Sequence, residues 1–406
     1  MEYQEYINQK KEIYEYLYLF IKEENEEEEE EEENYQRLLE NIKKQSIQES
    51  KEELVLFLRL LLNIFNHHHR YPSFSTKFFK ILDFLSETIK QIFTNIEIFE
   101  LLKSNRMIIL HLIDKGILRI DEPITNKILQ LSQGSEWSYK YFFYPEIKPY
   151  ISEGERLKIE NFLEERNFNI LDTFDLFDQN RHRGENDSMI SSFIRSDSVS
   201  ELDTYLNKTN LPLSSQIRDS IFESNSILNE KPHTLIEYGA FYGSIQVVKY
   251  LWLKHVELSP SLWIYGIHSN NAELIHFLEE NHVEPPKGNY QECLLQSIEC
   301  HHNEISEYIS SQLLASENSV SIETHKNKID TIVGSINFKE IPSEICDQFL
   351  FFYLCFYGYS ELVNLYMKPK INKMKEKIIQ NIHFHNKVRI IIILIKFCAI
   401  CSNDIF

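Results

Sequence analysis

Apolar residues recur along the chain at helical spacing, and short polar breaks separate the segments that carry them. The first 22 residues form one such segment, with its apolar positions on a single helical face: Ile13, Tyr16, Leu17 and Phe20. Glu52 and Glu53 precede the next apolar run, and acids are favourable at the start of a helix. Only 10 Gly and 11 Pro occur in 406 residues, which disfavours folds with many tight turns. The pattern predicts an all-α chain.

A helix–turn–helix pattern then repeats along the second half of the chain. The clearest copy spans 234–251, and Gly243 at its centre predicts a turn at positive φ, as do Gly358 in the last copy and Gly116 after the apolar run at 107–113. Four further segments match it, at offsets that differ from copy to copy: 194–206, 261–278, 297–309 and 355–366. The gap between the last two leaves room for one eroded copy. Such hairpins bury both faces only when neighbours stack, so the pattern predicts a solenoid.

The copy at 234–251 carries the residues of a known repeat: Thr234, Ala240, Gly243, Val247, Val248 and Leu251. These positions resemble an ankyrin repeat. More narrowly, residues 100–370 resemble ankyrin-repeat proteins of the trichomonad type, which join an uncharacterised helical N-terminal region to the repeats. The resemblance implies protein binding, with no catalytic residue to carry over. Leu235 and Glu237 replace the Pro and His of the ankyrin pattern, and the spacing between copies is shorter than the usual ~33 residues.

The predicted fold is therefore a helical N-terminal region followed by an ankyrin-like helix-turn-helix solenoid. We divide the chain into five segments. These are an N-terminal helix with a Glu-rich tract (1–34), a helical N-terminal domain (35–150), a connecting segment with one weak repeat (151–230), the degenerate ankyrin-like repeats (231–370), and an unassigned apolar tail (371–406), which could be the end of a truncated array.

The ankyrin fold presents its inner helices and loops on a concave face, where exposed aromatic residues are typical interface anchors. We expect this face to carry Tyr238, Phe241, Tyr242, Tyr265, His268, Ser269, Glu299, Phe356 and Tyr357, with Cys300 beside Glu299. An alternative stays open for some of these side chains, above all Phe241 and Phe356. They would pack against adjacent helices instead.

Motifs of known chemistry are absent from the sequence: it has no phosphate-binding Gly-rich loop, no GxSxG and no HExxH. Consecutive histidines at 67–69 cannot all face one ion, so they indicate a loop or a helix end. His383, His385, Cys398 and Cys401 could supply four zinc ligands, but a solid apolar run separates them. We expect the adjacent Cys300, His301 and His302 to be exposed in a turn rather than ligating. The prediction is no enzyme, no catalytic residue, no cofactor and no metal.

The net charge of the chain indicates which classes of binding partner to expect. The formal net charge is −20, and ten Glu between residues 23 and 33 supply half of it. An acidic surface repels phosphate backbones, so we expect basic protein partners and no nucleic acid. The Glu run itself indicates a solvated segment, with a docking site for basic partners as the alternative.

Compartment and role follow from the remaining composition. The longest apolar stretches, 54–65 and 390–400, are shorter than the ~20 residues that cross a bilayer, and no signal peptide is visible. Six scattered cysteines favour a reducing compartment. We expect a cytoplasmic, monomeric protein-interaction module or scaffold that does not bind membranes. Two alternatives remain: an enzyme or enzyme regulator with an unrecognised site in 35–150, or a truncated family member without a function.

Overall fold

The computed structural model describes residues 2–22, 28–67, 74–134, 138–166, 168, 174–315, 322–341 and 348–368. In this part of the chain all regular secondary structure is helical, apart from one isolated antiparallel bridge between Gln216 and Thr234. The all-α prediction is confirmed. None of the helices described is long and apolar enough to cross a membrane.

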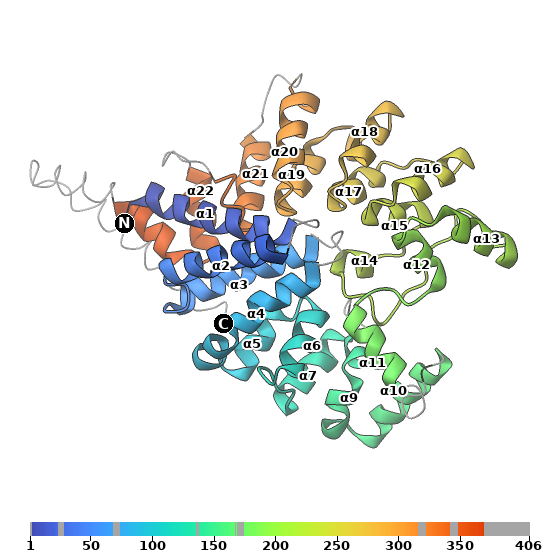
Figure 1. The fold of residues 1–406 in the computed structure, drawn as a ribbon, viewed down its shortest axis with the longest axis horizontal. Helices are drawn as coiled ribbons and strands as arrows, with labels where there is room; N and C mark the ends of the chain where they lie inside the picture. Colours follow the sequence, from blue (N-terminus) through green and yellow to red (C-terminus); the bar gives the residue numbers. More distant parts are fainter. Residues whose placement is uncertain are drawn as a thin grey trace, which may run out of the picture. The chain divides into compact units, whose positions relative to one another are not determined.

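The helices divide between two compact units (Figure 1). The central unit consists of residues 46–288, and the terminal unit combines residues 1–45 with 289–406. The predicted repeat region, 231–370, therefore contributes to both units. The predicted segment boundaries at 34, 150, 230 and 370 stay predictions.

The first half of the central unit is a bundle of helices: α3 (Lys51–His67), α4 (Phe74–Ile92), α5 (Asn95–Leu102), α6 (Arg106–Asp114) and α7 (Glu122–Leu131). α3 packs against α4 and α5, and α5 packs against α6 and α7. Thr94 and Glu97 form a capping box at the start of α5, where each side chain bonds the other residue's backbone N–H. Gly116 follows α6 at φ +62°, as its position after an apolar helix predicts.

Short helices continue the bundle beyond residue 138. They are α8 (Tyr139–Phe142), α9 (Tyr144–Ile147), the 3-10 turn η1 (Lys148–Tyr150), α10 (Glu153–Glu165) and α11 (Phe174–Arg183). The break at 144–149 is thus a pair of short helical turns, with Tyr144 and Ile147 buried. α10 packs on α8, and α11 packs on α6.

Three helical hairpins complete the central unit. They are α12 (Met189–Arg195) with α13 (Val199–Thr209), α15 (Leu235–Tyr242) with α16 (Ile245–Leu253), and α17 (Ser261–His268) with α18 (Ala272–Glu280); α14 (Ser226–Glu230) precedes the second hairpin. Among the first helices, α15 packs against both α12 and α17, and among the second helices α13 packs against α16. A Cβ at Gly239 would lie 3.5 Å from Ile194 Cγ2, so glycine lets α15 and α12 approach closely.

The terminal unit holds α1 (Tyr3–Lys22), α2 (Glu28–Lys44), α19 (Gln291–Glu299), α20 (Asn303–Tyr308), the π-turn η3 (Ile309–Leu313), α21 (Ile322–Gly334) and α22 (Gln348–Phe356), followed by a helical stretch over 360–368. α1 packs on α2, and α21 packs on both α19 and α22. Ile13, Leu17 and Phe20 of α1 are buried as predicted, but Tyr14 is buried in place of Tyr16. The described part of the Glu run begins α2.

Each of the five predicted repeat copies is a helical hairpin, and α21 with the turn after it fills the predicted gap. The first helices all end in a residue at positive φ: Asp197, Gly243, Asn270, His301, Ile336 and Gly358. Backbone bonds of the Schellman type close these turns, for example from Ser244 N to Gly239 O at 2.9 Å and from His302 N to Ser297 O at 2.9 Å. The predicted glycine turns at Gly243 and Gly358 are confirmed.

Candidate functional site

The nine residues predicted for a concave face do not form an exposed surface. Glu299 and Phe356 are exposed, and Tyr242 and Tyr357 are partly buried. The other five are buried: Tyr238, Phe241, Tyr265, His268 and Ser269. The alternative of core packing therefore holds for Phe241, which has no exposed surface, but not for Phe356, which is 55% exposed.

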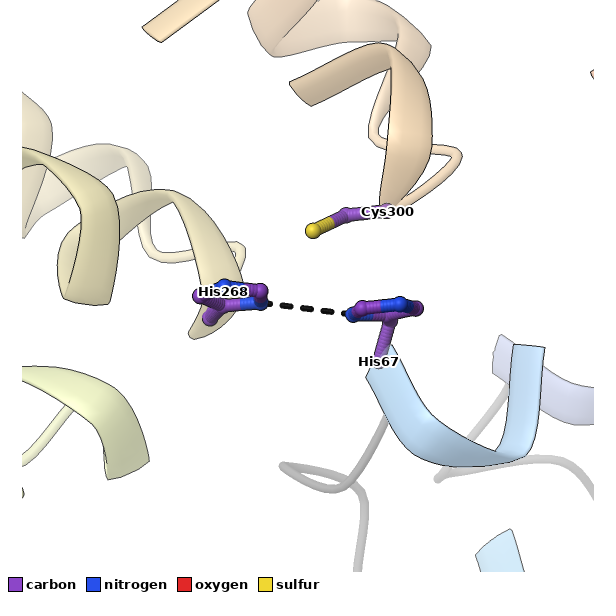
Figure 2. Close-up of side chains that lie close together, drawn as sticks. All are labelled: His67, His268 and Cys300. Carbon is purple, nitrogen blue, oxygen red and sulfur yellow. Dashed lines mark hydrogen bonds between the residues drawn. The ribbon is translucent and has the colours of Figure 1, made fainter. Parts of the chain in front are cut away.

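One cause of this burial is a contact inside the central unit, between the helical bundle and the hairpins. His67, at the end of α3, faces His268, at the end of α17, and their Nδ1 atoms lie 3.3 Å apart (Figure 2). In this contact one ring donates from Nδ1 and the other accepts. Cys300, also drawn in Figure 2, belongs to the terminal unit. The helix-end interpretation is confirmed for His67; His68 and His69 lie outside the described residues, as do His383, His385, Cys398 and Cys401.

Tyr238 is covered by a second set of contacts in the same unit. Arg195 donates to the Tyr238 hydroxyl at 2.8 Å and to the Asn186 carbonyl at 3.0 Å. Its Nε also forms an ion pair with Glu185 at 3.1 Å. Tyr238 is thus an internal hydrogen-bonding residue that ties α15 to α12.

Beside Tyr238 the central unit buries an acid, Glu223, on the segment between α13 and α14. Its side chain is 3% exposed, and its Oε1 accepts from the backbone N–H of Asn225 at 3.1 Å. The other oxygen, Oε2, has no hydrogen-bond partner. Burial raises the pKa of Glu223 to about 7, although the charges of Arg195 and Arg106 oppose the shift.

A small cavity of about 10 Å³ lies against this acid, with room for about one water molecule. Glu223 and Tyr238 line it together with Asn186, Ile217, Arg218, Asp219, Ser220, Leu228, Asn229 and His233. His233 is buried, its Nδ1 lies 2.9 Å from the Tyr265 hydroxyl, and its Nε2 has no hydrogen-bond partner. Burial lowers the pKa of His233, so the neutral imidazole is the favoured form.

The segment that carries Glu223 also connects the bundle to the hairpins. Arg106 of α6 donates to the Ile221 carbonyl at 2.9 Å and to the Ser138 hydroxyl. Asn225 donates from its side chain to the Asn66 carbonyl at 2.9 Å. The sequence analysis missed this cluster. Its one local signal is an acid directly after two large apolar residues, Ile221 and Phe222.

Two exposed apolar side chains lie next to each other at the end of α16: Trp252 is 38% exposed and Leu253 is 67% exposed. The Trp252 ring meets the buried Phe277 of α18 edge-to-face, with centroids 5.5 Å apart. We call Trp252 and Leu253 the outer-helix patch. Patches of this kind mark interaction sites more often than single exposed residues do.

In the terminal unit the turn at Cys300, His301 and His302 is buried, so the prediction of an exposed turn was wrong. α1 and the turn after α21 cover it. Tyr14 donates to the His301 carbonyl at 3.1 Å, and the His301 Nε2–H donates to the Ser335 carbonyl at 2.7 Å. Burial lowers the pKa of His301 to about 4, which keeps the imidazole neutral.

The predicted N-terminal domain offers one histidine–carboxylate pair that bears on the enzyme alternative. His111 Nε2 lies 2.7 Å from Asp83 Oδ1, and Asp83 Oδ2 accepts from Lys115 at 2.7 Å. The His111 ring also stacks on Phe79 with centroids 4.1 Å apart. These contacts account for the pair as an ion-paired junction between α4 and α6.

No protein-family model, curated protein or solved structure matches this chain.

Proposed function

We propose that the chain is a non-enzymatic protein-interaction module built on an ankyrin-like solenoid of helical hairpins. The observation that carries the proposal is the repeated packing of α12, α15 and α17, with the same backbone-bonded turn at the end of each first helix. Stacked hairpins give a pre-ordered surface, so a partner that docks there orders few side chains of this chain. The proposed role needs no cofactor or metal.

The outer-helix patch is the binding surface we propose, in place of the buried first-helix face. Tryptophan is among the most frequent interface anchors, and Leu253 beside it is largely exposed. Both exposed side chains lie on α16, and the Trp252 ring is held against Phe277 of the neighbouring hairpin.

Charge around the patch indicates the kind of partner. Residues 249–284 contain five acidic residues (Glu257, Glu273, Glu279, Glu280, Glu284) and two basic ones (Lys249, Lys254), a difference of three negative charges. We therefore propose a protein segment with one or two large apolar side chains flanked by Lys or Arg. The free thiol of Cys293 supports a reducing setting for this binding.

A peptide-display selection against the full chain tests this proposal. The expected peptides carry an aromatic or aliphatic residue beside basic residues, and bind more weakly as salt rises. In the double variant Trp252→Ala, Leu253→Ala, we expect the affinity for such peptides to fall at least 10-fold, because an interface anchor contributes at least about 1.4 kcal/mol.

The matched control is the double variant Leu157→Ala, Leu176→Ala. Both side chains are exposed in the same unit but lie on α10 and α11. Equal helicity by circular dichroism shows that all variants fold. The proposal fails if the selected peptides bind the Trp252 and Leu253 variant as tightly as the unchanged chain, or if the control variant loses binding equally.

A further inference from the structure

The segment over residues 214–233 lies against the first helix of the second hairpin, and backbone bonds hold both of its ends. Ile217 donates to the His233 carbonyl at 2.7 Å, and Leu235 donates to the Ser215 carbonyl at 3.2 Å. In its middle, Ser224 donates to the Gly184 carbonyl at 2.9 Å. We call residues 214–233 the covering segment, because its His233 contacts Tyr265 and its cavity is closed on one side by Tyr238.

Glu223 is the acid that this segment buries, and charged or titratable groups face it from every element around it. They are Arg106 on α6, Arg195 on α12, Glu185 before α12, Tyr238 and Tyr242 on α15, and Arg218, Asp219 and His233 of the covering segment itself. The two nearest cations already bond other groups: Arg195 the Tyr238 hydroxyl, and Arg106 the Ile221 carbonyl. They therefore offset only part of what it costs to keep an ionised Glu223 away from water.

We propose that Glu223 is a proton-sensitive latch: the protonated acid stays buried and holds the covering segment on α15, and its ionisation favours release of the segment. The carboxyl loses its proton to solvent when the segment opens, and it regains the proton when the segment closes. Release exposes Tyr238 and separates Tyr265 from His233. Tyr238 and Tyr265 are residues of the face that the sequence predicts for partner binding. The proposal does not depend on the outer-helix patch.

The direction with pH follows from the two pKa values. In the open segment the carboxyl has its ordinary pKa of 4.5, and in the closed segment burial raises the pKa to about 7. Between these values the closed form holds more protons than the open form, so opening increases as pH rises from 4.5 to about 7 and is constant above it. Protonation of Glu223 favours the closed segment most in acid, whereas His233 of the same segment acts in the opposite direction because burial lowers its pKa.

Amide hydrogen exchange on the full chain measures this opening. His233 titrates in the unchanged chain and in Glu223→Gln alike, so the ratio of amide protection between the two proteins isolates the contribution of Glu223. For the Ile217 and Ser224 amides, we expect the ratio of protection in the unchanged chain to that in Glu223→Gln to fall roughly 50-fold between pH 5 and pH 7.5. Oxidative labelling of Tyr238 should follow the same pattern.

Glu185→Gln is the matched control, because it removes a partly exposed carboxylate that also faces Arg195; it should retain the pH dependence of the unchanged chain. An equal loss of protection in the unchanged chain and in Glu223→Gln would overturn the proposal. So would protection of the Ile217 and Ser224 amides at pH 7.5 that is as high in the unchanged chain as in Glu223→Gln, with equal helicity by circular dichroism showing that the variant folds. Binding at the outer-helix patch is measured separately, so either proposal can fail alone.

Discussion

Among the titratable groups that the two units bury, Glu223 of the central unit and His301 of the terminal unit respond to pH in opposite directions. Glu223 of the central unit keeps its proton because burial raises the pKa of the carboxyl to about 7. His301 of the terminal unit releases its second proton because burial lowers the pKa of the imidazole to about 4. Both sites favour the uncharged form, but for an acid that form is protonated and for a histidine it is deprotonated.

This difference predicts a different stable pH range for each unit. The stabilisation that protonated Glu223 gives the central unit is fully present below pH 4.5 and is lost as pH rises through about 7. The stabilisation that neutral His301 gives the terminal unit is present above pH 6.5 and is lost as pH falls toward about 4. The described residues provide separate probes, since Trp252 and Trp263 belong to the central unit and Cys293, Cys300 and Cys355 belong to the terminal unit.

The largest expected effect is on the central unit. Glu223→Gln replaces the acid by an uncharged group of the same shape, so it should raise the free energy of unfolding at pH 8 by about 3 kcal/mol. At pH 4 the two proteins should differ little. Denaturant titration followed by tryptophan fluorescence measures both values, and a variant that is less stable than the unchanged chain at pH 8 would contradict the assignment.

The second effect is on the terminal unit. Between pH 7 and pH 5 the terminal unit of the unchanged chain should lose about 2 kcal/mol of stability. The reason is that His301 binds a proton in the unfolded state but stays neutral in the folded state. His301→Asn keeps a residue that tolerates the positive φ of this position and should remove the pH dependence. Pulsed thiol labelling of Cys293 and Cys300, quantified by mass spectrometry, follows this unit. An equal acid loss in the variant would show that another group is responsible.

The smallest expected effect is the loss of one hydrogen bond in the terminal unit, which lowers stability without changing its dependence on pH. Tyr14→Phe removes the hydroxyl that donates to the His301 carbonyl and should cost about 1 kcal/mol in the terminal unit. The cost should be the same at pH 7 and pH 8, since no group in this contact changes its charge there. Thiol labelling of Cys300 measures it, with tryptophan fluorescence of the central unit expected to stay unchanged.

Local patterns in the sequence predicted the helices and those turns that glycine marks. Gly116, Gly243 and Gly358 all adopt the expected positive φ. The equivalent turn at Ile336 carries no such signal, because backbone bonds close it and the side chain has little part in that.

The candidate sites were not predictable in the same way. The burial of Glu223 depends on Arg106 and Arg195, and the donor to the neighbouring Ile221 carbonyl lies 115 residues earlier in the chain. The prediction that the aromatic face is exposed was wrong for the same reason. The sequence pattern within one repeat cannot show that α3, from the start of the central unit, ends against α17.

The pairing of Tyr14 with His301 also sets an order of events during synthesis. These residues are 287 positions apart, and both belong to a unit whose two pieces flank the central unit in the sequence. At the usual 5–20 residues per second, a ribosome needs roughly 15–60 s to add the second residue after the first. Throughout that time Tyr14 of α1 has no His301 to stack on or donate to, whereas residues 46–288 emerge as one continuous stretch. The central unit can therefore fold before the two pieces of the terminal unit meet.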